Sequence, residues 1–221
     1  MSTSPASANV CTTPPAIATV RERERDLPVL DEADVVVVGG GPGGIGAAIA
    51  AARTGARTIL IERFGSFGGT WTAGLLSAIM PFPFVRGIFS EIVEALRADS
   101  AWRYWDENNT YGNGASYDAE TAKYVLDQLV LGAGVVPYFF TFVADVLREG
   151  DRVTGVIVES KEGRAVIRGK QFIDASGDGD VCARAGASFS QGREKDGAVQ
   201  PMTMIFTMAG VDDAKATAAA T

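Results

Sequence analysis

The chain has 221 residues, 47% of them apolar and 26 of them glycine, which suits one large α/β domain or one domain with a fragment of another. Its net charge of −7 argues against nucleic acid as a partner, and no basic run contradicts this. No apolar run approaches the ~20 residues that cross a bilayer, and the first residues lack the pattern of a secretory signal. We therefore expect a cytoplasmic protein with no membrane span and no nucleic-acid partner.

The chain contains no histidine and two cysteines, Cys11 and Cys182. The lack of histidine excludes a Ser–His–Asp triad, a histidine general base and histidine metal ligands within this chain. Two cysteines provide neither a disulfide framework nor a set of metal ligands, so no metal site is expected. For Cys182, a small buried residue is a better interpretation than a redox thiol.

Residues 1–30 are rich in Pro, Ser and Thr and predict an N-terminal arm. The segment 34–62 then reads DVVVVGGGPGGIGAAIAAARTGARTILIE and contains the parts of a βαβ unit. Val35–Val38 has the composition of a strand buried on both faces of a parallel sheet. Apolar residues at helical spacing from Ile45 predict a helix with its free N–H groups facing phosphates, and 58–61 predicts a second strand.

Gly39, Gly41 and Gly44 follow the G-x-G-x-x-G spacing. The first glycine permits a tight turn, the second lets the backbone approach a pyrophosphate, and the third lets the helix pack closely on the strand. Glu62 ends the second strand, where a carboxylate accepts the hydroxyls of an adenosine ribose and repels a 2′-phosphate. Strand, glycines, helix, strand and acid in this order predict a dinucleotide-binding site.

The glycine-dense segment 64–76, FGSFGGTWTAGLL, predicts a loop that brings its backbone against a flat ligand, with Trp71 able to cover that ligand. An ordinary packed loop is the alternative. Residues 88–96 have helical spacing, and the aromatic, turn-rich segment 99–117 predicts a loop. We expect region 75–117 to face substrate or a partner. A further helix is predicted from Asp118 to Leu131, ended by glycines.

The second half of the chain predicts mostly strands. A strand at 135–140 precedes a β-meander of strands at 143–148, 152–160 and 164–169, and QFIDA at 171–175 predicts another buried strand. SGDGD and a short helix at 181–185 follow, then a strand at 202–208 and a helix N-cap at Asp212 and Asp213. We expect a nucleotide-binding domain at 31–200 and the start of a truncated substrate domain at 201–221.

Taken together, these segments make the chain similar to the glutathione-reductase-like flavoproteins and, more narrowly, to the FAD-dependent oxidoreductase family. The segments are DLPVLDEADVVVVGGGPGGIGAA, ER-x-x-x-FGGTWTAGL, YDAETAKYVLDQLV, FIDASGDGDVCARAGA and PMTMIFTMAGVDD. They occur in the family's usual order. The resemblance implies an α/β fold with a Rossmann-like FAD-binding domain, in which a parallel sheet carries a β-meander.

The resemblance also implies which residues bind FAD. They are Gly39, Gly41, Pro42, Gly43 and Gly44 at the pyrophosphate; Glu62 and Arg63 at the adenosine; Gly68, Gly69 and Thr70 at the pyrophosphate, ribityl chain or flavin edge; Val143 at the adenine; and Ala175, Ser176, Gly177 and Asp178 closing over the cofactor. A helix cap is the alternative role for Asp178 and for Asp180.

The implied reaction is hydride transfer from a small organic substrate to flavin, followed by reoxidation by oxygen or a separate acceptor. No catalytic base is evident; Tyr104, Asp106, Tyr111 and Tyr117 are candidates by position alone. Too few residues follow Asp178 for a substrate domain and the return to the cofactor that the family shows. We therefore expect the N-terminal half of a flavoenzyme, completed by a second polypeptide from a split gene or a cleaved precursor.

Three other interpretations stay open. SGDGDVCARAG faintly resembles the Asp-Gly motif of aromatic hydroxylases, which favours a flavin-dependent monooxygenase or halogenase. The lack of histidine and of a returning segment favours a non-catalytic cofactor-binding subunit of a heteromeric complex. An NAD-binding protein without flavin is disfavoured by the FGGTWTAG and DASGDGD segments.

Overall fold

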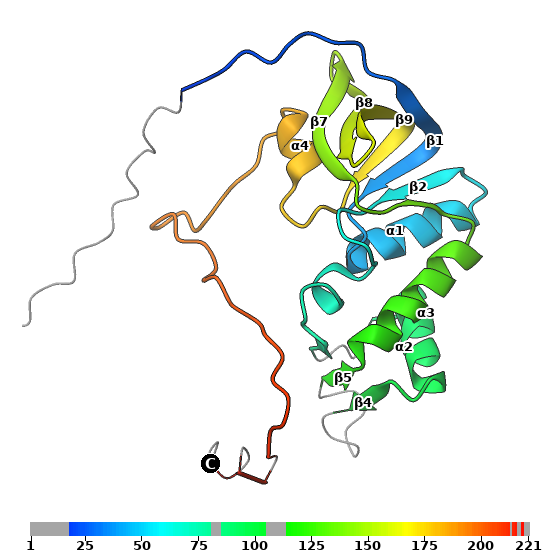
Figure 1. Ribbon diagram of the computed structural model, residues 1–221, viewed down its shortest axis with the longest axis vertical. Helices are drawn as coiled ribbons and strands as arrows, with labels where there is room; N and C mark the ends of the chain where they lie inside the picture. The colour runs from blue at the N-terminus through cyan, green and yellow to red at the C-terminus, as the bar shows by residue number, and fades with distance from the viewer. Residues whose placement is uncertain (1–17, 81–84, 105–113, 213, 216–217, 219–221) are drawn as a thin grey trace, which may run out of the picture.

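The computed structural model describes residues 18–80, 85–104, 114–212, 214, 215 and 218. Its largest element is a six-stranded sheet with the strand order β6-β2-β1-β9-β8-β7 (Figure 1). The strands are β6 (Val136–Tyr138), β2 (Thr58–Ile61), β1 (Val29–Val38), β9 (Gly163–Asp174), β8 (Arg152–Ser160) and β7 (Phe142–Glu149). The first four are parallel to one another, and β8 and β7 continue the sheet as an antiparallel meander. The predicted α/β class and parallel sheet with a β-meander are confirmed.

Strand β1 lies inside the sheet between β2 and β9, and its second half is largely buried on both faces. Val36 and Val37 point to opposite faces, yet each is 0% exposed. Val37 belongs to the core beneath the helices, whereas Val36 belongs to the core beneath the meander. A run of β-branched residues is suited to this position because both sides of the strand must exclude water.

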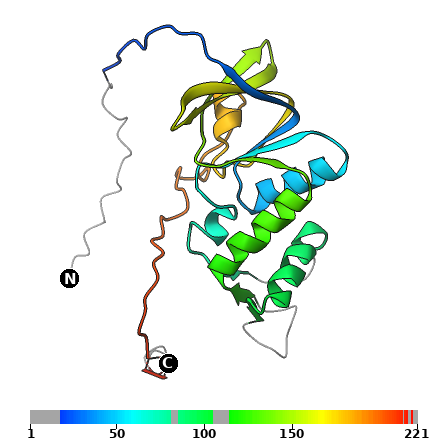
Figure 2. The same ribbon diagram turned by 45° about the vertical axis from the view of Figure 1, so that its right-hand side comes forward.

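Helices α1 (Pro42–Arg53), α2 (Ile88–Ala98) and α3 (Ala119–Gly132) lie together on one side of the sheet (Figure 2). The predicted start of α3 is confirmed, since the Asp118 carboxylate accepts a hydrogen bond from the Thr121 N–H at 2.7 Å. The short helix α4 (Asp180–Arg184) packs instead on β7 and β9. Within the described ranges, no helix is long and apolar enough to cross a membrane.

A second, small antiparallel sheet has the strand order β3-β5-β4. Its strands are β3 (Ala78–Ile79), β5 (Ala115–Tyr117) and β4 (Trp102–Tyr104). The prediction of a loop over the whole of 99–117 is therefore wrong for its two ends. Trp102 and Tyr117 are buried and their rings are stacked, with centroids 6.4 Å apart. Because the backbone at these buried residues must be hydrogen-bonded, the two segments pair as strands.

Strand β9 differs from the prediction of two strands at 164–169 and 171–175. It runs without a break because β1 pairs with it along nearly its whole length, including Ala33 with Gly169 and Val35 with Gln171. Its first half also pairs with β8. One strand therefore joins the meander to the nucleotide-binding end of the sheet.

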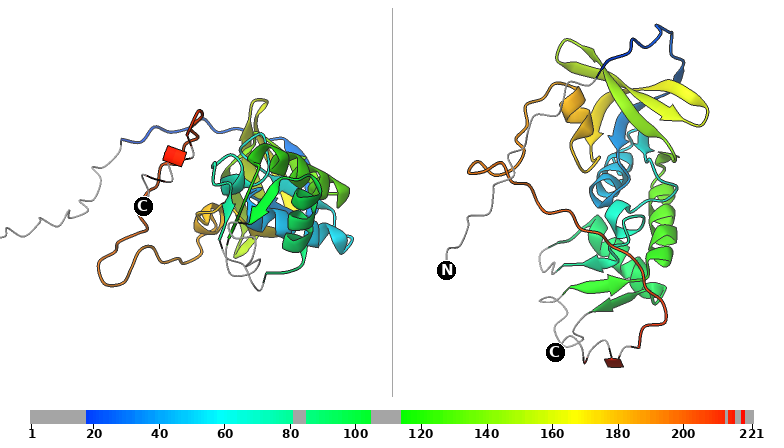
Figure 3. Two further views of the ribbon diagram at one scale, coloured as in Figure 1. Left: turned by 90° about the horizontal axis from the view of Figure 1, so that it is seen from below. Right: turned by 60° about the vertical axis from the view of Figure 1, so that its left-hand side comes forward.

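The predicted strand at 202–208 is absent from the structure. The described chain after α4 has no regular structure up to residue 212 and lies apart from the two sheets, as the left view of Figure 3 shows. Met202, Met204 and Phe206 are all exposed there. The alternating pattern suits a strand, but a strand forms only against a hydrogen-bonded neighbour, and the described residues supply none to this segment. Asp212 accepts a hydrogen bond from the Lys215 N–H, as an N-cap would, while Asp213 lies outside the described residues.

Candidate dinucleotide site

A cleft of ≈ 610 Å³ lies where strands β1, β2 and β9 end. In open α/β sheets, ligands bind outside the carboxyl ends of the parallel strands, and small-molecule sites have volumes of about 300–1,000 Å³. The cleft is lined by Val38, Gly39, Gly41, Pro42, Gly43, Ile61, Glu62, Arg63, Phe64, Gly69, Thr70, Ala73, Gly74, Thr141, Phe142, Val143, Asp174, Ala175, Ser176, Gly177, Gly179 and Asp180. Four segments distant in sequence thus form one site.

The N-terminus of α1 faces this cleft without a cap. Its N-cap residue is Gly41, which has no side chain to accept a hydrogen bond, Pro42 follows, and the first turn holds no acidic residue. The first N–H groups of a helix have no partner within the helix, and here the described chain provides no acceptor for those of Gly43 and Gly44. Free amides and the positive end of the helix dipole make this terminus suited to an anion such as a phosphate.

Two of the motif's glycines are required by close backbone contacts. Gly39 has a φ of +101°, a conformation that side chains rarely adopt, and a Cβ there would lie 2.2 Å from the Ala175 carbonyl oxygen. A Cβ at Gly44 would lie 1.8 Å from the Gly39 carbonyl oxygen. Gly44 does not line the cleft; it allows α1 to approach β1. By contrast, a Cβ at Gly41 or Gly43 would meet no protein atom within 4 Å.

Glu62, immediately after β2, is only 4% exposed. One carboxylate oxygen accepts the Gly40 N–H at 2.7 Å and the other accepts the Phe64 N–H at 2.8 Å. The carboxylate therefore fixes the turn before α1 and the segment after β2 in one arrangement. Each carboxylate oxygen has a second acceptor position, so this geometry leaves capacity for the hydroxyls of a ribose.

Beside Glu62, the wall of the cleft is aromatic and basic. The Arg63 guanidinium lies 4.7 Å from the centroid of the Phe64 ring, and both residues line the cleft with Phe142 and Val143. Of these, the sequence predicted Arg63 and Val143. The start of β7 is brought to this edge because the Thr141 N–H donates to the Glu62 carbonyl at 3.1 Å.

The glycine-dense segment lies against the turn before α1. The Gly68 N–H donates to the Gly40 carbonyl at 2.8 Å, so Gly68 supports the turn and does not itself line the cleft. Gly69 and Thr70 do line it. Trp71 is not in the wall of the cleft: its ring packs against the core, 6.2 Å from Phe89 and 6.4 Å from Tyr117 between centroids. The prediction that Trp71 covers a ligand does not fit this packing.

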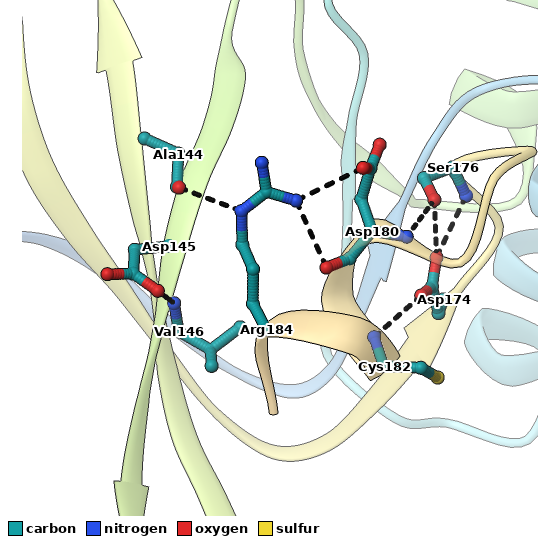
Figure 4. Close-up of polar contacts among 8 residues, drawn as sticks. All are labelled: Ala144, Asp145, Val146, Asp174, Ser176, Asp180, Cys182 and Arg184. Atoms are coloured by element: carbon teal, nitrogen blue, oxygen red, sulfur yellow. Dashed lines mark hydrogen bonds and ion pairs between the residues drawn. The ribbon is translucent and has the colours of Figure 1, made fainter. Parts of the chain in front are cut away.

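The loop between β9 and α4 is organised by Asp174 (Figure 4). One carboxylate oxygen accepts the Ser176 N–H at 3.1 Å and the Ser176 hydroxyl at 2.7 Å. The other accepts the Cys182 N–H at 2.8 Å. Partial burial raises the pKa of Asp174, but the hydrogen bonds from Cys182 and Ser176 outweigh it and hold the pKa below its usual range. Asp174 is therefore a carboxylate at neutral pH.

Asp178 and Asp180 differ from their predicted places. Asp178 does not line the cleft, whereas Asp180 does. Neither caps α4, whose N-cap is Gly179 and has no side-chain hydrogen bond. The Asp180 carboxylate instead pairs with Arg184 at 3.1 Å, and the Arg184 Nε donates to the Ala144 carbonyl of β7 at 2.9 Å (Figure 4).

The two described candidates for the catalytic base, Tyr104 and Tyr117, do not line the cleft. Tyr117 lies outside the cleft, its hydroxyl lies 2.9 Å from the Trp71 carbonyl and 3.0 Å from that of Leu76, and burial raises its pKa above the usual range. Tyr104 packs against the helix-side core, also outside the cleft. Asp106 and Tyr111 lie outside the described residues. Cys182 is exposed, contrary to the prediction, and slight desolvation of its thiol, together with the neighbouring Asp174 carboxylate, raises the pKa of that thiol.

Sequence reasoning missed Asp174, which organises a wall of the cleft, and Phe64 and Phe142, which line it. A signal for Asp174 was present: Asp followed two residues later by Ser, directly after a buried strand, is typical of a turn in which the carboxylate binds nearby N–H groups. No local signal marks Phe142, because only the tertiary contact with Glu62 brings it to the site.

Solved structures with the same architecture show which fold this protein has. A geranylgeranyl bacteriochlorophyll reductase-like protein from Thermoplasma acidophilum matches with a TM-score of 0.54 and 24% identity over 71% of this chain and 42% of its own. THI4 from Thermovibrio ammonificans matches with a TM-score of 0.54 and 24% identity over 73% of this chain and 67% of its own. The fold is that of the FAD-binding flavoproteins.

The chain belongs to the family of FAD dependent oxidoreductases, which it matches over residues 34–221. Among curated relatives, the thiamine thiazole synthase of Methanococcus vannielii is 32% identical over 166 residues, which are 67% of this chain and 57% of that protein. The dihydrolipoyl dehydrogenase of Trypanosoma brucei brucei is 54% identical over 46 residues, 21% of this chain and 10% of that protein. The chain thus matches little more than half of the first relative and a small part of the second.

Proposed function

We propose that the chain binds FAD in this cleft and forms the FAD-binding part of an oxidoreductase. The observation that carries the proposal is the uncapped N-terminus of α1, which opens on the same cleft as the buried carboxylate of Glu62. The first suits a pyrophosphate and the second the ribose of an adenosine, so together they fit the two ends of an ADP group. The open faces of Gly41 and Gly43 leave room for phosphates against the backbone.

In this proposal, Gly39, Gly41, Pro42 and Gly43 hold the pyrophosphate, while Glu62 and Arg63 hold the adenosine next to Val143. Gly69 and Thr70 lie on one wall of the remaining cleft and Ala175, Ser176 and Gly177 on another. Gly44 and Gly68 support the site from outside its wall, and Asp178 lies outside that wall in the loop before α4. When bound, FAD supplies the redox chemistry, accepting a hydride from a small organic substrate, and the protein supplies orientation and electrostatics.

We further propose that a second polypeptide completes the active site. The ionisable side chains that line the described cleft are Glu62, Arg63, Asp174 and Asp180. Backbone N–H groups engage Glu62 and Asp174, and Arg184 engages Asp180. A general base needs a carboxylate or other group that is free to take a proton from substrate, and these carboxylates already have donors. We therefore assign the base to a residue outside the described cleft, and we propose that a partner chain supplies it.

The test is the visible spectrum and native mass of the full chain, purified from its source under mild conditions. A flavin spectrum with a second polypeptide in the complex supports both proposals. A flavin spectrum on the chain by itself keeps FAD binding and contradicts the second polypeptide. Protein that stays colourless after incubation with excess FAD, with no change in its thermal midpoint, contradicts FAD binding.

The 32% match to a thiamine thiazole synthase supports a second candidate, a chain that takes part in making a thiazole. The glycine turn and Glu62 also suit an adenine dinucleotide without flavin, and we assign such a ligand to this candidate. This match covers 166 residues and so extends beyond the first βαβ unit. Ligand extracted from the purified protein separates the two candidates. An extract with the mass and colour of FAD supports the oxidoreductase, whereas a colourless adenine dinucleotide supports the second candidate.

A further inference from the structure

The helix α4 contributes Asp180 to the lining of the cleft but is too short to be stable by itself. It has five residues, Asp180–Arg184, whereas isolated helices in water are marginal below about 12 residues. Its N-cap, Gly179, contributes no side-chain hydrogen bond. Its position must therefore depend on contacts with other elements.

Contacts beyond the helix fix both of its ends. At its C-terminal end, Arg148 of β7 donates to the Ala185 carbonyl at 2.6 Å, and Arg184 donates to the Ala144 carbonyl at 2.9 Å. At the N-terminal end, the donors are the first-turn N–H groups, which a normal cap would satisfy. The Cys182 N–H donates to Asp174 at 2.8 Å, and the Asp180 N–H donates to the Ser176 hydroxyl oxygen at 3.0 Å.

Asp174 and Ser176 act as a single unit. The Ser176 hydroxyl donates to Asp174 at 2.7 Å while accepting from Asp180, so the carboxylate orients the hydroxyl that caps the helix (Figure 4). The same carboxylate oxygen accepts the Ser176 N–H at 3.1 Å, which closes the turn. Ala175 and Ser176 line the cleft, and the Ala175 carbonyl lies against Gly39 of the glycine turn.

We propose that Asp174 and Ser176 are positioning residues that cap α4 from the end of β9 and thereby hold the 175–179 loop in the shape that binds the cofactor. The inference rests on the proposed FAD site and extends it, because it assigns a role to two side chains through the loop that they shape. Asp174 acts on the cofactor through Ser176 and α4. Loss of the cap is expected to release the loop and weaken FAD binding without unfolding the sheet.

The experiment measures FAD affinity and thermal midpoint for the full chain and four variants. Asp174→Asn removes one acceptor, since its amide nitrogen must face a donor on one side. We expect an affinity for FAD about tenfold weaker, corresponding to about 1.4 kcal/mol. Asp145→Asn is the matched control, because this exposed carboxylate on β7 accepts only its neighbour's N–H, that of Val146, among the hydrogen bonds described. It is expected to bind FAD like the original chain.

Two substitutions of Ser176 distinguish a positioning role from a general loss of stability. Ser176→Ala loses the hydroxyl and is expected to weaken FAD binding several-fold, whereas Ser176→Thr keeps a hydroxyl and is expected to restore it. Hydrogen exchange on the flavin-free chain gives an independent readout. The Asp180 amide should lose protection in Ser176→Ala and keep it in Ser176→Thr. This pair also serves if Asp174→Asn fails to fold.

The outcomes distinguish this inference from the proposed function. If the original chain binds no FAD, the proposed function falls and the inference falls with it. If the original chain binds FAD and the Asp174 and Ser176 variants bind it equally well, the positioning role is wrong while the FAD site stands. An Asp180 amide that stays protected in Ser176→Ala also contradicts the cap.

Discussion

Two helices begin at the edge of the same cleft, and they differ in whether their first N–H groups have acceptors within the protein. Helix α1 begins at Gly41 and Pro42 with no side-chain cap and no acid in its first turn. Helix α4 also begins after a glycine, but Asp174 and Ser176 accept two of its first N–H groups. The difference shows which terminus is available to a ligand. Free amides at α1 suit an anion, whereas those at α4 are used to hold a wall of the cleft.

The largest effect on stability and FAD binding is expected from a substitution that prevents α1 from packing closely on β1. In Gly44→Ala, the new Cβ would lie 1.8 Å from the Gly39 carbonyl oxygen, so the helix must move away from the strand. We expect about 3 kcal/mol of lost stability and loss of FAD binding. Urea unfolding and FAD titration measure the two effects. The control is Gly46→Ala in the same helix, where a Cβ meets no atom within 4 Å. Equal stability of the two variants would contradict the close packing.

The next largest effect is expected from Glu62, which supports the turn before α1. Glu62→Gln replaces an acceptor oxygen by an amide group, which cannot accept from both the Gly40 and the Phe64 N–H. A buried N–H left without a partner costs about 1–3 kcal/mol. We expect that loss in chemical unfolding of the flavin-free chain, together with weaker FAD binding. Unchanged unfolding would mean that the carboxylate does not hold the turn.

Gly41→Ala tests the N-terminus of α1 by itself, because it adds a methyl group beside the free N–H groups without disturbing the packing of the helix. A Cβ at Gly41 meets no protein atom within 4 Å, so the thermal midpoint should not fall. If a pyrophosphate approaches this backbone, the methyl group should weaken FAD binding about tenfold, or about 1.4 kcal/mol. Isothermal titration of the variant with FAD tests this. Unchanged affinity would place the phosphates elsewhere.

The smallest effect is the pH dependence of the α4 cap. Hydrogen bonds lower the pKa of Asp174 in the folded state, so its contribution to stability is present above the unfolded pKa of about 3.9 and is lost as the pH falls through the folded value. The difference in unfolding free energy between the original chain and Asp174→Asn should be constant near neutrality and shrink below about pH 4. Asp180 and Arg184 are present in both proteins, so their titration largely cancels. A difference that persists at the lowest pH would contradict this assignment.

The βαβ unit could be predicted from sequence because its determinants are local. The strand predicted at Val35–Val38 is the last part of β1, which begins at Val29, and the helix predicted from Ile45 begins at Pro42. These elements, the glycine turn and the strand at Thr58–Ile61 lie within one contiguous segment. Each is specified by periodicity or by the absence of side chains at Gly39 and Gly44. The same reasoning placed Glu62 beside the cleft, since an acid at the end of a strand next to β1 must lie near the glycine turn.

Other features depend on contacts between distant segments. Strands β4 and β5 of the small sheet come before and after residues 105–113 in the sequence. They pair with each other because Trp102 and Tyr117 are buried. Strand β9 is continuous because β1 continues beside it. Residues 202–208 have the alternation of a strand but lack a neighbour in the described chain. A periodic pattern indicates which face of a segment is apolar. A strand also needs a neighbouring strand to pair with, and the pattern does not indicate which segment that is.

By itself, the sequence determined the α/β class, the family and the glycine turn with its acid, because these depend on short spacings and on residue types that few conformations tolerate. Only the tertiary structure decided that Tyr117 is buried away from the cleft, that Asp180 and not Asp178 faces it, and that Asp174 and Ser176 cap α4. The physical reason is that a hydrogen bond or a buried position depends on where a distant backbone lies, and folding alone brings those groups together.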